Sequence, residues 1–240
     1  MPYWEKCRPK NTIAMIDALL DLFYPRLCVV CGRRLQEGER HLCLHCIQHL
    51  PRTQFHREES QPMEQLFRGK IDADFAIAFF HSSPRSEYRT LLHHIKYRDG
   101  KECARYLGRL YAEELATDGV LQHIDLIVPV PLHRHRLRKR GYNQSEWIAR
   151  GLSDATGIPV DTASLLRRKA NPSQTRLSLY ERWLNTRSIF ALREGCDLQG
   201  RHVLLVDDIV TTGATLLACA ETLQSAHPAG IALLTLSIAR

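Results

Sequence analysis

Short apolar runs alternate with amphipathic stretches along most of this chain. Five short, mainly apolar runs predict strands, at 73–81, 125–130, 162–166, 202–206 and 231–238. Four longer stretches carry apolar residues at helical spacing and predict helices, at 86–97, 102–116, 144–155 and 213–225. Strands that alternate with helices build a parallel sheet covered on both faces. The expected fold class is therefore α/β with a parallel sheet.

The beginning of the chain follows a different pattern. Residues 12–23 place apolar side chains on one side of a predicted helix, and a cysteine cluster and a polar linker follow them. We therefore expect two domains, 1–60 and 61–240. Asp17 and Asp21 interrupt the first apolar stretch, which argues against a signal peptide. No apolar run reaches the roughly 20 residues of a spanning helix, so we expect no membrane span and a cytoplasmic location.

Composition narrows the class of partner without choosing one. The 240 residues are 44% hydrophobic and 25% charged, which excludes disorder or a coiled coil as a description of the whole chain. The net charge is +7. This excess favours anionic partners such as phosphates, nucleotides or nucleic acid.

Two Cys-x-x-Cys pairs lie close together near the start of the chain. Their four thiolates, from Cys28, Cys31, Cys43 and Cys46, can surround Zn²⁺ as a tetrahedron. A redox pair would explain one of the two pairs, and His41 or His45 can replace a ligand. A site with four protein ligands is closed, so we expect the zinc to be structural rather than catalytic.

The segment 203–215 carries the most chemistry. A buried strand ends in two carboxylates, and a Thr/Gly turn then opens a helix. The free N–H groups of a first helical turn suit a phosphate, whereas carboxylates suit sugar hydroxyls, directly or through Mg²⁺. The alternative is a purely structural role, in which the two acids end a strand and the turn caps a helix. The predicted sugar-phosphate site comprises Val206, Asp207, Asp208, Thr211, Thr212, Gly213, Ala214 and Thr215.

A cationic segment follows the predicted strand at 125–130. It reads as a basic loop, in which five of the eight residues from 133 to 140 are Arg or Lys. Such a loop can hold a pyrophosphate beside Mg²⁺, because arginine donors match phosphate oxygens. It can also be a solvated surface loop, or one that contacts the nucleic-acid backbone. The candidate pyrophosphate ligands are Pro131, Arg138, Lys139 and Arg140, the last also a candidate catalytic residue.

The segment 203–215 resembles the 5-phosphoribosyl-1-pyrophosphate (PRPP) motif of type I phosphoribosyltransferases. Three further patches, at 91–97, 140–145 and 174–190, together with the cysteine pairs, make nearly the whole chain similar to the ComF family of competence-associated proteins. The resemblance implies a zinc-finger-like module before a phosphoribosyltransferase-like domain and a link to DNA uptake. The 211–215 loop would hold the 5-phosphate, and Asp207 and Asp208 would hold the ribose hydroxyls and serve catalysis. Implied partners are PRPP or another sugar phosphate, DNA-uptake proteins such as a helicase, and single-stranded DNA.

Two further features of the sequence bear on a phosphoribosyltransferase site, a lid and an acceptor side. The resemblance implies a lid over 174–185, carrying Gln174, Thr175 and Arg182, although these residues can equally organise a local loop.

Thr211 stands where purine-salvage enzymes of this fold usually have an aspartate. Residues 71–100 can frame an acceptor, and His93 or His94 can act as an acid or base there, or simply pack. Two hypotheses follow: a Mg²⁺-dependent phosphoribosyltransferase (a glycosyltransferase), or a non-catalytic DNA-uptake partner that binds nucleotide or nucleic acid.

Overall fold

The structure is a computed structural model that describes residues 25–57, 62–97, 100–168 and 189–239. The chain divides into two compact units, 1–49 and 50–240. The predicted helix at 12–23 lies outside the described residues, as does the predicted lid with Gln174, Thr175 and Arg182.

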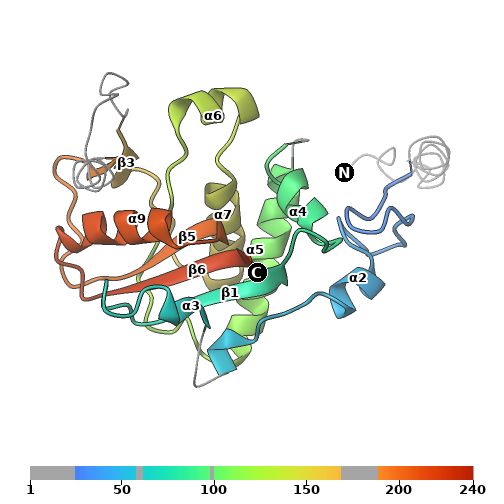
Figure 1. The fold of residues 1–240 in the computed structure, drawn as a ribbon, viewed down its shortest axis with the longest axis horizontal. Helices are drawn as coiled ribbons and strands as arrows, with labels where there is room; N and C mark the ends of the chain where they lie inside the picture. The colour runs from blue at the N-terminus through green and yellow to red at the C-terminus, as the bar shows by residue number, and fades with distance from the viewer. Residues whose placement is uncertain (1–24, 58–61, 98–99, 169–188, 240) are drawn as a thin grey trace, which may run out of the picture. The chain divides into compact units, whose positions relative to one another are not determined.

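A four-stranded parallel sheet forms the centre of the second unit (Figure 1). Its strand order is β1-β6-β5-β2, so the last two strands of the chain lie in the middle. Nearly every residue of these strands is buried, as expected of a parallel sheet with both faces covered. This confirms the predicted α/β class. The strands are β1 (Ala76–Ser82), β6 (Gly230–Ala239), β5 (His202–Val210) and β2 (Leu126–Pro129).

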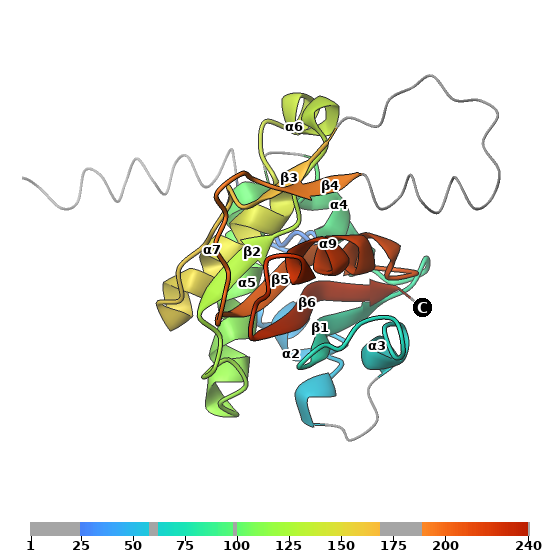
Figure 2. The same cartoon turned by 90° about the vertical axis from the view of Figure 1, so that its left-hand side faces the viewer.

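Helices cover both faces of this sheet. Figure 2 shows α5 (Lys101–Thr117) and α7 (Gln144–Thr156) on one face and α9 (Ala214–Gln224) on the other. Two glycines allow α5 and α7 to approach closely. A Cβ on Gly108 would collide with the Ile148 carbonyl, and one on Gly151 would collide with the Arg105 carbonyl.

Two segments differ from the sequence-based prediction. The expected basic loop is a helix, α6 (Arg134–Arg140), with no buried residue. His133 caps its N-terminus by accepting from the His135 amide at 3.3 Å, and Gly141 ends it with φ +81°. The expected strand at 162–166 is β3 (Leu165–Arg167), which does not join the parallel sheet. It pairs antiparallel with β4 (Phe190–Leu192) in a separate two-stranded sheet.

The short elements complete the described fold. In the first unit lies α2 (Leu44–Gln48). In the second unit lie the 3₁₀ turn η2 (Phe55–Arg57), α3 (Pro62–Gln65) and α4 (Arg89–His94). Among the described helices, none is both long enough and apolar enough to cross a lipid bilayer.

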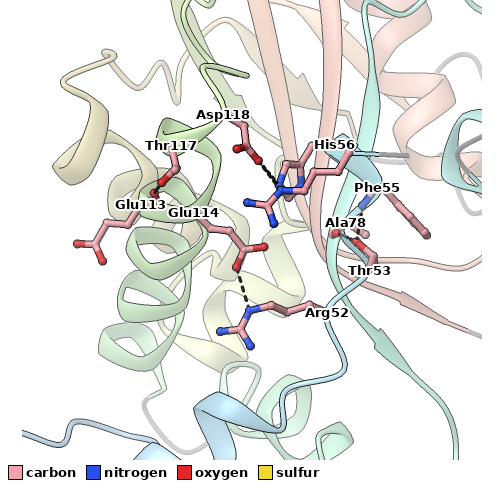
Figure 3. A network of polar contacts seen from close by, with 10 residues as sticks. Arg52, Thr53, Phe55, His56, Ala78, Glu113, Glu114, Thr117 and Asp118 are labelled. Carbon is pink, nitrogen blue, oxygen red and sulfur yellow. Dashed lines mark hydrogen bonds and ion pairs between the residues drawn. The ribbon is translucent and has the colours of Figure 1, made fainter. Parts of the chain in front are cut away.

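Ion pairs fasten the segment that leads toward β1 onto the C-terminal half of α5 (Figure 3). Arg52 Nε lies 2.9 Å from Glu114 Oε2, and Arg57 Nε lies 2.7 Å from Asp118 Oδ2. His56 Nε2 lies 3.0 Å from the same Asp118 oxygen. The hydrogen bond from Arg57 is the main cause that lowers the pKa of Asp118. These contacts make residues 50–57 part of the second unit.

Candidate functional site

Two adjacent carboxylates lie near the carboxyl end of β5. Asp207 and Asp208 are both buried, with 9% and 4% of their surface exposed. Asp207 Oδ1 accepts hydrogen bonds from Ser145 Oγ at 2.8 Å and from the Asp208 amide at 2.9 Å. In an open α/β sheet, ligands bind beyond the carboxyl ends of the strands. The pair therefore lies where such a fold places its ligand.

Burial strongly affects the charge of Asp207. Burial and, second, the neighbouring Asp208 charge together raise the pKa of Asp207 from 3.8 to about 7. The Ser145 hydroxyl, the Asp208 amide and the Lys96 ammonium act in the opposite direction. A cation brought to this position would favour the ionised form of both carboxylates. The donor set thus fits Mg²⁺, a hard cation that prefers carboxylate oxygens.

Asp208 is paired with a lysine from a distant part of the chain. Lys96 Nζ lies 2.8 Å from Asp208 Oδ2, and the two side chains are 23% and 6% exposed. Lys96 belongs to the short stretch after α4, which packs at the carboxyl ends of the strands. Tyr142 Oη fixes this stretch by donating to the Ile95 carbonyl at 2.7 Å. The position of Lys96 is therefore determined by the fold and not only by the ion pair.

The start of α7 is anchored to β2 and places Ser145 beside Asp207. Asn143 caps the helix by accepting from the Ser145 amide at 3.2 Å. Its amide nitrogen donates to the Val130 carbonyl at 3.0 Å, and the Val130 amide donates to Val206 at 2.9 Å. The loop after β2 is consequently held against β5.

The 211–215 loop forms a hollow of about 40 Å³ at the N-terminus of α9. Gly213 caps α9 with φ +77°, a conformation that favours glycine. A Cβ at Gly213 would lie 2.9 Å from Phe67 Cε1, so a larger residue also has no room. Thr211, Thr212, Ala214 and Thr215 are exposed around this loop. Free helix N–H groups, hydroxyls and an open rim suit a phosphate.

The basic helix α6 is only partly directed toward this site. Arg140 Nη1 donates to Gln144 Oε1 at 2.9 Å, and its guanidinium lies 5.0 Å from the centroid of the Tyr97 ring. Arg138 and Lys139 are exposed, and Pro131 is half-buried in the loop before the helix. Both views show α6 standing out from the body of the second unit (Figures 1 and 2). Arg140 therefore contacts Gln144 at the start of α7 and the Tyr97 ring, whereas Arg138 and Lys139 face solvent.

A second arginine lies at the base of the predicted lid. Arg167, on β3, is half-buried and lies 5.3 Å from the centroid of the Phe190 ring. Burial and the neighbouring Arg136 charge lower the pKa of Arg167, whereas Asp207 raises it. Arg167 is thus a partly desolvated cation that feels the charge of Asp207, and it adds positive charge suited to a phosphate.

The four predicted zinc ligands come together in the first unit. The sulfur atoms of Cys28, Cys31, Cys43 and Cys46 all lie within 4.8 Å of one another. Gly32, at φ +70°, donates its amide to the Cys28 carbonyl at 2.9 Å and so closes the first knuckle. Sulfurs bound to zinc at about 2.3 Å in a tetrahedron would lie at comparable separations. The cluster thus fits a structural zinc ion.

Two contacts of the aspartates were not foreseen from the sequence. Ser145 and Lys96 both occur in the patches that resemble the ComF family, and that is the signal that could have singled them out. Nothing in their local spacing predicts that one bonds Asp207 and the other pairs with Asp208.

Comparisons with known proteins agree with both units. Residues 106–238, more than half of the chain, match the phosphoribosyl transferase domain, and residues 19–57 match the double zinc ribbon domain. The chain is 33% identical over 207 residues to the DNA utilization protein YhgH of Escherichia coli K12, covering 82% of this chain and 83% of that one. It is 36% identical over 101 residues to competence protein F of Haemophilus influenzae, covering 42% and 44%.

Among solved structures, the glutamine PRPP amidotransferase from B. subtilis, complexed with ADP and GMP, shares 21% identity and a TM-score of 0.42. The matched region covers 57% of this chain and 26% of the amidotransferase chain. The family matches and the four-cysteine cluster together support a structural zinc in the first unit. With a zinc ribbon before a phosphoribosyl transferase domain and relatives named for DNA utilization and competence, the chain belongs to the ComF family.

Proposed function

We propose that the second unit binds PRPP together with Mg²⁺ and transfers the phosphoribosyl group of PRPP to an acceptor. This transfer would be a part of DNA utilization. The carrying observation is the convergence of two buried carboxylates and a glycine-headed helix at one edge of a parallel sheet. The 211–215 loop would hold the 5-phosphate. Asp207 and Asp208 would accept hydrogen bonds from the ribose hydroxyls.

Arg140 and the residues around it would hold the pyrophosphate end. Pro131 shapes the turn after β2, and Arg138 and Lys139 add charge on the same helix. Mg²⁺, when bound, supplies neutralisation of the pyrophosphate charge, which stabilises it as a leaving group. In the transfer, the C1–O bond to pyrophosphate breaks and pyrophosphate leaves with the bonding electrons. The acceptor atom bonds to C1 and its proton passes to water.

Calorimetry with PRPP tests the binding part of this proposal. The wild-type protein should bind PRPP in the presence of Mg²⁺, and Asp207→Asn combined with Asp208→Asn should weaken binding at least tenfold. Asp72→Asn, at an exposed aspartate outside the site, is the matched control and should bind as the wild type does. Absence of binding by the wild-type protein to PRPP, ribose 5-phosphate and nucleoside monophosphates would overturn the proposal. Release of pyrophosphate in the presence of an acceptor tests the transfer itself.

The exposed basic helix favours a second function, non-catalytic handling of nucleic acid. Five of the seven residues of α6 are Arg or Lys and none is buried, so the helix can lie along a phosphate backbone. Single-stranded DNA is the partner to test, by fluorescence anisotropy at increasing salt. Replacing Arg134, Arg136 and Arg138 by Gln should weaken binding and flatten its salt dependence. No signal from the wild type at low salt would exclude this function.

A further inference from the structure

A larger pocket opens beside the carboxylate pair. Its volume is about 390 Å³, within the range of small-molecule sites. The carboxyl ends of β1 and β6 and the last part of β5 form one wall, and the segment from α4 forms the other. The lining residues are Ser82, Ser83, Pro84, Arg89, Leu92, His93, Lys96, Tyr97, Ile209 and Ala239.

This pocket is continuous with the proposed sugar-phosphate site through two residues. Lys96 lines the pocket while its ammonium lies 2.8 Å from Asp208. Ile209 also lines it and directly follows Asp208 in β5. A molecule in the pocket would thus lie next to a ribose held by the aspartates. On the proposed function, this is where an acceptor would be placed.

The charge of the lining is one-sided. Arg89, His93 and Lys96 are basic, and none of the lining residues is acidic. Arg89 makes no ion pair with any residue in the described parts of the chain, and it is exposed at the pocket edge. A carboxylate entering here would find a guanidinium, whose paired donors match its two oxygens.

The remaining walls suit a flat, apolar body. Leu92, Ile209 and Pro84 contribute aliphatic surface. The Tyr97 ring is 42% exposed, and the His93 ring lies 4.9 Å from it, centroid to centroid. Aromatic surfaces of this kind favour the faces of planar rings.

We propose that this pocket binds a planar ring that carries a carboxylate, and that such an acid is the acceptor class of the site. The proposal rests on the proposed function for its catalytic meaning. The charge of the lining argues for it over a neutral ring, because a neutral ring would give Arg89 no anionic partner.

Calorimetry on the full chain tests this with rings that differ only in the acid group. The probes are benzoate against benzamide, nicotinate against nicotinamide and orotate against uracil, each titrated with and without saturating PRPP and Mg²⁺. The acids should bind at least tenfold more tightly than their neutral partners. Arg89→Gln should weaken the acids about tenfold and leave the neutral rings unchanged, whereas His93→Gln, which removes an aromatic surface, should weaken acids and neutral rings alike. Arg85→Gln, at an exposed arginine outside the pocket, should bind the acids as the wild type does.

The two proposals fail in distinguishable ways. If PRPP binds but no acid does, or if neutral rings bind as tightly as acids, the acidic acceptor is wrong and the PRPP site stands. If Arg89→Gln binds the acids as the wild type does, the acids bind elsewhere and the pocket assignment is wrong. If acids bind with the expected pattern but PRPP does not, the pocket stands as an acid-binding site and the transferase function is wrong.

Discussion

Lys96 Nζ lies 2.8 Å from Asp208 Oδ2 and so joins the segment after α4 to the end of β5. The carboxylate is almost fully buried, and the ammonium is about one quarter exposed. This contact connects the wall of the 390 Å³ pocket to the carboxylates proposed to hold ribose. Lys96, far away in the sequence, also acts to lower the pKa of Asp207.

Removing the lysine should leave Asp208 buried without its counter-charge. We expect Lys96→Met to lower the free energy of unfolding by about 1–3 kcal/mol, less than for a fully buried pair because Lys96 is partly solvated. Asp208→Asn should recover part of this loss in the double variant. Urea unfolding of the four proteins in the cycle measures it, with Lys70→Met as a surface control. Additive effects of the two changes would show that the pair does not contribute.

The Ser145 hydroxyl should lower the pH at which the site begins to bind PRPP. In the free protein the pKa of Asp207 is about 7, so binding of PRPP with Mg²⁺ should increase from pH 6 to pH 8 as Asp207 ionises. Ser145→Ala removes a donor that favours the ionised form and should move the midpoint to higher pH. Calorimetry across this range measures both midpoints. Ser153→Ala on the same helix is the control, and an identical profile for Ser145→Ala would contradict the prediction.

Burial of Asp207 should make the protein less stable as pH rises. The pKa of Asp207 is raised from 3.8 to about 7 on folding, so between these values the folded state holds a proton that the unfolded state has released. This contribution to stability is present below about pH 4 and is lost as pH rises to about 7. Asp207→Asn should therefore gain stability relative to wild type by a few kcal/mol at pH 8 and little at pH 4.5. Thermal unfolding at both pH values measures this, and an equal difference at both would refute the raised pKa.

Replacing each of two glycines with similar backbone conformation by alanine should distinguish the cost of backbone strain from the cost of a steric clash at the phosphate loop. Gly213 and Gly200 have φ of +77° and +72°, but only Gly213 has a neighbour, Phe67, in the way of a Cβ. Gly200→Ala should cost about 1 kcal/mol from backbone strain alone. Gly213→Ala should cost more and should also weaken PRPP binding at least tenfold. Chemical unfolding and calorimetry measure the two effects. Equal stability losses would show that Phe67 yields without cost.

Zinc should be bound by the first unit at one ion per chain. Cys46→Ser removes one of four clustered thiolates and should abolish stoichiometric zinc, whereas Cys196→Ser, outside the cluster, should retain it. Elemental analysis of the purified proteins measures the zinc content. PRPP binding by the second unit should survive in Cys46→Ser, because its proposed ligands lie outside residues 1–49. Wild-type protein without zinc would contradict the prediction.

The sequence by itself determined the local chemistry. Apolar runs gave the strands of the parallel sheet, because buried strands need continuous apolar side chains. The order of strand, two carboxylates, glycine turn and helix in 203–215 gave β5 and α9, since its signals lie within a few residues of one another. The paired cysteine spacing likewise gave the cluster, because each knuckle is local.

Tertiary structure alone decided what surrounds those aspartates. The strand order β1-β6-β5-β2 brings the end of β1 and the α4 segment beside β5, although they are far apart in the chain. Lys96 and Ser145 therefore reach Asp208 and Asp207 through packing that no local periodicity encodes. The basic segment at 133–140 is a helix rather than the predicted loop. The sequence predicted a loop because the segment has no apolar face to bury, but the cap at His133 and the helix end at Gly141 favour a helix there.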